Sequence, residues 1–441
     1  PPSDGAVETP LGGGSRFFPA DGLFLAEAQK KTHNPGSWSV RRKSTRDDTL
    51  PVCEEASASL RSGSDSAPRE SCPVPMRLVL EDGTEYVGES LGANVAVAGE
   101  VVFNTAMAGY PESLTDPSYA GQILVQTYPL IGNYGVPAEP RGPSLSPFQS
   151  PRIHVQGLVV QRGSIHHSHH RAGRSLAEWL RSEDVPLLTG VDTRALTQRL
   201  REHGTMQGWL FPATMTLKDA QRSAKSVEMR EEVFRRVAPP APVRYLGGEL
   251  QVLVIDVGIK TGIIECLLER GASVLRVPWH IDFLELARDA DAVLIGNGPG
   301  DPCDLEGLTA QVRQLLAMKD VPIFGVCLGH QILARAAGCT TYKLRYGHRG
   351  ANQPVRDLLT GRCYVTSQNH GYAVDTGRLP PGCTPWFVNL NDRTNEGLQW
   401  DDRPVRSVQF HPEARPGPRD TEFLFDDFLR LAGELRAVRG S

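Results

Sequence analysis

Apolar and polar positions in the second half of the chain alternate in a rhythm typical of a parallel α/β sheet. Short apolar runs at 251–256, 292–295 and 323–326 predict strands, and helical patterns over 261–270 and 305–316 lie between them. This strand–helix alternation predicts a doubly wound, mostly parallel sheet. Ligands of such sheets bind beyond the carboxyl ends of the strands, so the residues that follow each strand are the first candidates for a site.

The first half of the chain contains more strand patterns than helix patterns. Residues 77–88 alternate around an Asp-Gly pair, which predicts a β-hairpin, and further strands are expected at 99–104 and 122–127. Asp192 stands where it can cap a helix over 192–202. These patterns predict a smaller, strand-rich α/β domain ahead of the larger sheet.

Composition divides the chain into four segments. Residues 1–75 are rich in Ser, Gly and Pro with mixed charge, which predicts a disordered extension. An organellar targeting signal is the alternative, although acidic residues are unusual in such signals. We expect a strand-rich N-terminal domain at 76–212, a linker at 213–249 and the α/β domain at 250–435.

Overall composition excludes several classes of partner. The 441 residues include 47 Lys and Arg against 51 Asp and Glu, and a net charge of −4 gives no reason to expect nucleic acid or an anionic membrane surface as a partner. No apolar run approaches the roughly 20 residues that span a bilayer. Eight scattered cysteines without a C-x-x-C pair argue against a zinc site or a disulfide framework, and favour a reducing, cytoplasmic location.

Cys327 is the strongest candidate for a reactive side chain. It follows the apolar run 321–326, precedes a helical pattern and is flanked by Gly325 and Gly329, as in a nucleophile elbow. The two glycines are expected to let the backbone turn, and the helix N-terminus favours a thiolate. The five other cysteines beyond residue 75 lack such surroundings and are expected to be packing residues: Cys266, Cys303, Cys339, Cys363 and Cys383.

His411 and Glu413 supply the partners that a nucleophilic cysteine needs. They are two residues apart after an apolar stretch, so on an extended segment both side chains point to the same side. Taken singly, a core histidine and a solvated carboxylate are the simpler interpretations. Together with the elbow at Cys327, they favour a Cys-His-Glu triad in which the carboxylate orients the imidazole.

These residues resemble those of the class I, or triad, glutamine amidotransferases. The resemblance extends over roughly 76–431 and is specifically to the small chain of carbamoyl-phosphate synthase, because other triad amidotransferases lack the N-terminal domain. It implies that Cys327 attacks the amide carbon of glutamine, and that a thioester forms and is then hydrolysed. The segments that carry it are 103–110, 114–119, 127–135, 297–302, 346–354 and 368–375.

The resemblance also implies the residues that contact glutamine. The backbone N–H of Leu328 can stabilise the oxyanion, and the Gly-Pro-Gly turn after residue 297 is expected to supply a second donor. The full set implied is Ser118, Gly298, Gly300, Leu328, Gln331, Asn369, Gly371 and Tyr372. One departure from the family pattern is Gly262, where relatives usually carry asparagine.

By the same resemblance, the released ammonia travels through a tunnel to a synthetase large chain or a fused synthetase domain. That partner uses bicarbonate and MgATP to make carbamoyl phosphate for pyrimidines, arginine or both. This chain has no Walker lysine and no acidic metal pair in a grasp-like setting, so we expect no ATP site in it. We expect no cofactor and no metal in this chain. The histidines of 166–170 could suggest a metal site, but four in five residues cannot easily converge on one ion, and a solvated loop is the simpler interpretation.

Three alternatives stay open at this point. The chain could serve another acceptor, as in anthranilate or guanylate synthesis, although the domain at 76–212 argues against it. It could be a non-catalytic regulatory or scaffolding subunit, although the intact triad argues against that. It could also be the N-terminal part of a larger fusion protein.

Overall fold

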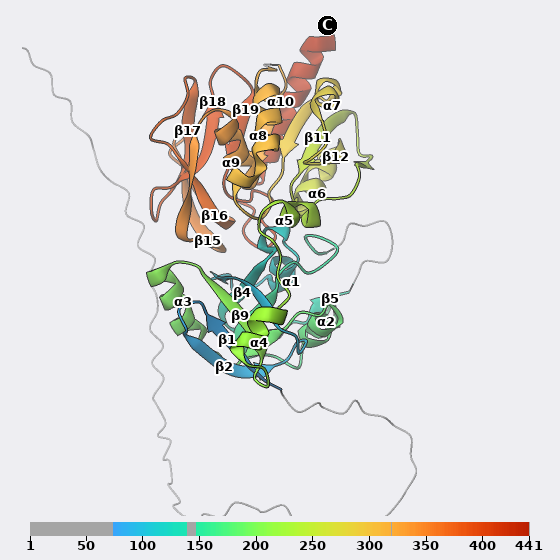
Figure 1. Cartoon of the computed structure of the whole chain (residues 1–441). Helices are drawn as coiled ribbons and strands as arrows, with labels where there is room; N and C mark the ends of the chain where they lie inside the picture. Colours follow the sequence, from blue (N-terminus) through green and yellow to red (C-terminus); the bar gives the residue numbers. More distant parts are fainter. Residues whose placement is uncertain (1–73, 139–146, 319, 441) are drawn as a thin grey trace, which may run out of the picture. The chain divides into compact units, whose positions relative to one another are not determined.

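The computed structural model describes residues 74–138, 147–318 and 320–440, so almost all of the extension predicted for 1–75 lies outside the described residues. The described chain contains a closed barrel and a ten-stranded sheet, with helices packed around both (Figure 1).

The barrel confirms the strand-rich domain expected in the first half. Its strands are β1 (Val74–Leu80), β2 (Glu85–Ser90), β3 (Val97–Asn104), β4 (Gln122–Ile131), β6 (Gly157–Gly163), β8 (Leu187–Thr189) and β9 (Met206–Pro212). They close in the order β1-β2-β8-β6-β4-β3-β9. The predicted hairpin is β1–β2, whose turn requires Gly83 at φ +83°. Apolar side chains on the inner faces, such as Leu78, Val101 and Ile123, are fully buried in the barrel core.

Short elements around the barrel position the first site residue. They are α1 (Tyr110–Leu114), the 3-10 turn η1 (Pro117–Tyr119), α2 (Leu176–Ser182), α3 (Thr193–His203) and the strand pair β5 (Val136–Pro137) and β7 (Ala172–Arg174). Asp192 caps α3 as predicted, accepting from the Ala195 N–H at 2.9 Å. Asp116 caps η1 in the same way, accepting from the Ser118 N–H at 2.9 Å. This cap fixes the backbone at Ser118, in the turn that precedes β4.

The segment between the two domains, expected as a linker, is largely structured. It forms α4 (Leu217–Ser223), α5 (Glu231–Val237) and β10 (Val243–Tyr245). Helix α5 buries Val233 and Phe234 in the core of the second domain. Strand β10 pairs antiparallel with β12 (Ala272–Pro278), so this segment supplies an edge of the large sheet.

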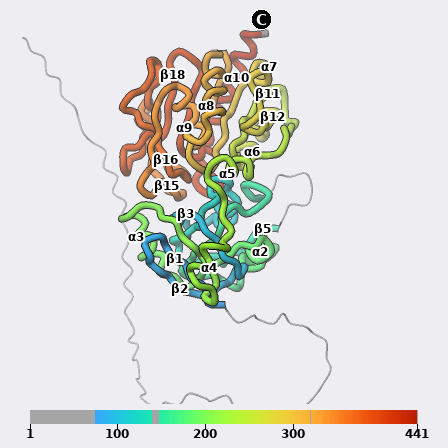
Figure 2. The backbone as a smooth tube through the Cα atoms, viewed as in Figure 1, coloured from blue at the N-terminus to red at the C-terminus, as the bar shows by residue number. Residues whose placement is uncertain are grey.

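The centre of the large sheet is parallel, as the alternation predicts. β12, β11 (Leu250–Asp256), β13 (Ala292–Ile295), β14 (Ile323–Val326) and β19 (Val405–Val408) lie side by side in that order. Side chains of β11 alternate between two cores: Leu253 and Ile255 pack with α8 (Glu306–Leu316) and α9 (Leu328–Ala336), while Val252 and Val254 pack with α6 (Thr261–Glu269) and α10 (Phe423–Gly440). The sheet is therefore covered on both faces (Figure 2), and α7 (Leu284–Asp289) and η2 (Pro302–Leu305) complete this domain.

The other half of the sheet is an antiparallel extension that the alternation does not predict. It consists of β18 (Asn395–Trp400), β17 (Cys383–Asn389), β15 (Thr340–Asp357) and β16 (Cys363–Asp375). β15 and β16 are long and mostly polar, and their register shifts between Lys343 and His348 and again between Gly350 and Gln353. Such irregular, polar strands lack the period-two pattern by which strands are found in a sequence.

Candidate active site

The turn at Cys327 has the geometry of a nucleophile elbow. Cys327 adopts φ 55° and ψ −104° between β14 and α9, and its N–H donates to the Val408 carbonyl at 2.8 Å. The predicted role of the flanking glycines is corrected, because the positive φ falls on the cysteine itself. Gly325 and Gly329 instead allow close packing: a Cβ on Gly329 would lie 2.1 Å from the Ile295 carbonyl oxygen. The elbow thus combines a strained nucleophile with a helix packed tightly on the sheet.

His411 and Glu413 are brought together behind Cys327. His411 Nδ1 lies 2.7 Å from Glu413 Oε1, and both side chains are almost completely buried. His411 Nε2, the nitrogen left free for the cysteine, has no hydrogen-bond partner among the described residues. The Cys327 Sγ lies 3.6 Å from the Asn369 carbonyl oxygen. This order of groups places an acceptor nitrogen toward the thiol and a carboxylate on the far side of the ring.

A buried amine, Lys260, contacts the Glu413 carboxylate, so Lys260, Glu413 and His411 form a row of buried charged groups. Its Nζ lies 2.8 Å from Glu413 Oε1 and donates to the Ala414 carbonyl at 2.7 Å. Burial disfavours a charged Glu413, but Lys260 and His411 outweigh burial and hold the pKa of that carboxyl at about 2. Burial likewise opposes an imidazolium at His411, and the Glu413 carboxylate more than offsets it, so the pKa of His411 is raised. The site therefore stabilises a charged carboxylate beside a basic imidazole.

Lys260 was not among the predicted site residues. It begins α6, and its N–H donates to Asn297 Oδ1 at 3.0 Å, which ties the start of that helix to the loop after β13. Gly262, the departure from the family pattern, lies beside the same group: a Cβ there would be 3.3 Å from Glu413 Cγ. The signal available in the sequence was a lysine four residues after the end of the buried strand β11.

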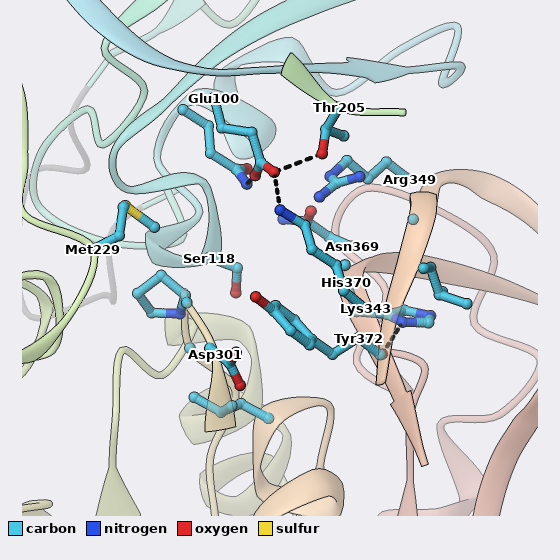
Figure 3. A pocket seen from close by; sticks show the side chains of 18 of the residues that line it. Glu100, Ser118, Thr205, Met229, Asp301, Lys343, Arg349, Asn369, His370 and Tyr372 are labelled. Atoms are coloured by element: carbon cyan, nitrogen blue, oxygen red, sulfur yellow. Dashed lines mark hydrogen bonds and ion pairs between the residues drawn. The ribbon is translucent and has the colours of Figure 1, made fainter. Parts of the chain in front are cut away.

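One cavity of about 440 Å³ opens at the elbow, and every residue predicted to contact glutamine lines it. Figure 3 shows its walls, with Ser118 supplied by the barrel and Asn369 and Tyr372 supplied by β16. The predicted residues that line it are Ser118, Gly298, Gly300, Leu328, Gln331, Asn369, Gly371 and Tyr372, together with Cys327. The sequence thus identified residues from two domains that the fold brings into one pocket.

Hydrogen bonds to buried groups hold these residues in place. Gln331 Nε2 donates to the Tyr372 carbonyl at 2.9 Å and to Gln409 Oε1 at 3.0 Å. Asn369 Nδ2 donates to Asp116 Oδ2 at 2.9 Å. Ser118 Oγ accepts from Asn297 Nδ2 at 3.0 Å. The last two bonds cross from one domain to the other, so the pocket and the junction between the domains are one structure.

The geometry at the elbow also suits the stabilisation of an oxyanion. Leu328 begins α9, so its N–H is one of the free donors at a helix N-terminus. Gly298 packs against it: a Cβ there would lie 2.9 Å from Leu328 Cδ2 and 2.3 Å from the Val257 carbonyl oxygen. Gly300 requires glycine for its φ of +81°. The turn can therefore approach the elbow at Gly298 because this residue has no side chain.

A second, smaller cavity of about 20 Å³ lies behind the triad. It is lined by residues of both domains, among them Asn104, Ala106, Ser367, His411 and Pro416. His411 lines this cavity, whereas Cys327 lines the larger pocket.

Two further groups of side chains contain residue types that can bind metal or react. His348, His370 and Glu396 are clustered, but His348 already pairs with Asp392 at 2.8 Å and faces Glu396 at 3.4 Å. The cluster is therefore an ion-pair network, and the absence of a metal in this chain stays a prediction. The expectation that the other cysteines pack inside is wrong for Cys303 and Cys363, which are exposed, and holds for Cys266, Cys339 and Cys383.

None of the described helices is long and apolar enough to cross a bilayer.

Comparison with protein families identifies the class first. The family model for the class-I glutamine amidotransferases matches residues 253–431, the domain that contains the elbow, so fold and site define a class-I amidotransferase. The model described as the CPSase domain of the carbamoyl-phosphate synthase small chain matches residues 78–210, the barrel.

Relatives match along both domains. The arginine-specific small chain of carbamoyl phosphate synthase from Yarrowia lipolytica is 44% identical, and the match covers 83% of this chain and 85% of the relative. The corresponding chain from Neosartorya fischeri is 47% identical, covering 82% and 81%. The chain therefore belongs to the carbamoyl-phosphate synthase small chain family. Multifunctional protein URA2 of Saccharomyces cerevisiae is 46% identical over 81% of this chain, but the match spans only 18% of that longer protein.

Proposed function

We propose that this chain is the glutaminase component of a glutamine-dependent carbamoyl-phosphate synthase. The observation that carries the proposal is Cys327 in the wall of a pocket lined by all eight predicted glutamine contacts, together with the buried pair of His411 and Glu413. The barrel supports the choice of acceptor, because the family model that matches it is that of the synthase small chain.

The proposed reaction begins with attack of the Cys327 sulfur on the side-chain amide carbon of glutamine. His411 Nε2 takes the thiol proton and returns it to the departing nitrogen, which leaves as ammonia. The Leu328 N–H and the Gly-Pro-Gly turn stabilise the oxyanion of the tetrahedral intermediate. Water, activated by the same imidazole, then hydrolyses the thioester to glutamate. Glu413 keeps the imidazole oriented and stabilises its protonated form.

The ammonia is proposed to pass to a synthetase partner, either a separate large chain or a domain of the same polypeptide. A small cavity of about 20 Å³ lined by His411 is compatible with this route, because that imidazole is the proposed proton donor to the leaving nitrogen. Bicarbonate and MgATP would be bound by that partner, which makes carbamoyl phosphate for arginine or pyrimidine synthesis.

The test is glutamine hydrolysis by wild type and Cys327→Ser, each with and without a synthetase large chain. Loss of the thiolate should lower kcat at least about 1000-fold. The matched control is Cys383→Ser, a buried cysteine on β17, which should retain activity. Activity that requires Cys327, increases with the partner and yields carbamoyl phosphate supports the proposal. Hydrolysis that ignores the partner indicates another acceptor, and no hydrolysis in any combination indicates a scaffolding role.

A further inference from the structure

One corner of the glutamine pocket contains charges that the triad does not use. Glu100 on β3 accepts from Lys343 Nζ on β15 at 2.7 Å and from Thr205 Oγ1 at 2.6 Å, and its other oxygen accepts from Gln122 Nε2 at 2.8 Å. Arg349, also on β15, lies beside this group and lines the same pocket (Figure 3). Glu100 therefore already has three donors.

Arg349 is the charged group of this corner that is least satisfied. Arg349 is only 5% exposed, and its Nη1 donates to the Tyr346 carbonyl at 2.6 Å. Its Nε has no hydrogen-bond partner among the described residues. The guanidinium also lies against a predicted glutamine contact, since a Cβ on Gly371 would be 3.3 Å from Arg349 Nη2.

The unpaired guanidinium at this corner favours an anionic ligand. The pocket is lined by the carboxylates Glu81, Glu100, Asp301 and Asp304 and by the cations Arg230, Lys343 and Arg349, but Glu100 pairs with Lys343 and no described carboxylate forms an ion pair with Arg349. One positive charge is thus left without a partner, and a buried charge is costly unless it is paired. The eight predicted glutamine contacts are all uncharged, so none of them neutralises the α-carboxylate that free glutamine carries.

We propose that Arg349 binds the α-carboxylate of glutamine and so makes the pocket selective for the free amino acid over glutamine whose carboxyl is amidated or peptide-bound. The inference rests on the proposed function, because it identifies which end of the substrate the corner recognises. A guanidinium suits this role, since its donors match the two oxygens of a carboxylate. Arg349 acts here in binding and specificity, away from the reacting atoms at Cys327.

The test compares hydrolysis of L-glutamine with that of L-glutaminamide, in which a neutral amide replaces the α-carboxylate. Wild type should prefer glutamine strongly in kcat/KM. Arg349→Met should raise KM for glutamine by about 100-fold, the loss expected for a charge-assisted bidentate pair, with kcat changed less than about threefold. The preference over glutaminamide should fall by the same factor. Arg349→Lys, which retains the charge in a similar volume, should retain part of the preference.

The matched control is Arg345→Met, on the same strand but exposed and outside the lining of the pocket. It should match wild type with both substrates. An unchanged preference in Arg349→Met and Arg349→Lys, or a fall in kcat at constant KM, overturns the inference while leaving the proposed function intact. If wild type hydrolyses neither substrate with or without the synthetase chain, the proposed function itself fails and the inference fails with it. If Arg349→Met does not fold, Arg349→Lys and the wild-type ratio of the two substrates decide the question.

Discussion

Replacing Lys260 by methionine tests whether the buried amine holds the carboxylate of the triad in its charged form. The substitution keeps the length of the side chain and removes its charge and its hydrogen bonds to Glu413 and Ala414. Glu413 is then left fully buried, with His411 as its only charged neighbour among the three groups of the row. We expect a protein that folds but is substantially less stable.

The magnitude follows from the shift in Glu413. Its pKa falls from an ordinary 4.5 to about 2, with Lys260 as the largest influence opposing burial. This difference corresponds to about 3 kcal/mol of stability. Breaking a buried ion pair by removing one partner costs about 3 to 5 kcal/mol, which agrees. Because the pKa is lowered in the folded state, this stability is present above pH 4.5 and is lost as the pH falls through about 2.

The assay is urea denaturation of wild type and Lys260→Met at pH 7 and at several lower pH values. The free energy of unfolding should differ by about 3 kcal/mol at pH 7, and the difference should shrink as the pH falls below 4.5. The control is Lys218→Met on the exposed surface of α4, expected within about 0.5 kcal/mol of wild type. A loss below about 1 kcal/mol at pH 7, or a loss independent of pH, would refute the reasoning.

Two further predictions concern the packing of Gly329 and the charge of His348. Gly329→Ala should destabilise the protein by more than about 2 kcal/mol, since the new Cβ would lie 2.1 Å from the Ile295 carbonyl oxygen. Gly307→Ala on α8, where a Cβ meets nothing within 4 Å, should be neutral or stabilise by up to about 1 kcal/mol; thermal denaturation of both variants checks the pair, and equal melting temperatures contradict the packing argument. Burial opposes a charged His348, but Asp392 and Glu396 raise its pKa to about 9 from 6.5, so the stability this provides is complete below pH 6.5 and is lost as the pH rises through about 9. His348→Gln should therefore cost about 3 kcal/mol at pH 6 and much less at pH 9.5 by urea denaturation, and a cost that does not vary with pH would count against the network.

The elbow and the strands of the parallel centre could be predicted because their signals are local. Cys327 lies between an apolar strand and an amphipathic helix, and the strands at 292–295 and 323–326 have the predicted bounds. The predicted glutamine contacts required the family resemblance as well, since Ser118 and Asn369 are 251 residues apart in the chain and have no shared local pattern.

What the sequence could not predict depends on contacts between distant segments. Lys260 and Glu413 form a pair only after the segments that follow β11 and β19 meet beyond the carboxyl ends of the parallel strands. The Arg349 Nε likewise becomes a buried donor without a hydrogen-bond partner only when β15 packs beside the end of β3. The antiparallel half of the sheet was missed because its strands are polar and irregular, and pairing with neighbours determines their conformation more than their own pattern does.

The hydrogen bonds from Asn297 to Ser118 and from Asn369 to Asp116 have a consequence for control of the enzyme. Because these bonds join the two domains beside the pocket, the rate of glutamine hydrolysis should depend on the position of the barrel relative to the second domain. A misplacement of about 1 Å in a substrate-positioning group can change a rate about 100-fold. A change in the position of the barrel would therefore be expected to alter the rate of glutamine hydrolysis without any direct contact to Cys327.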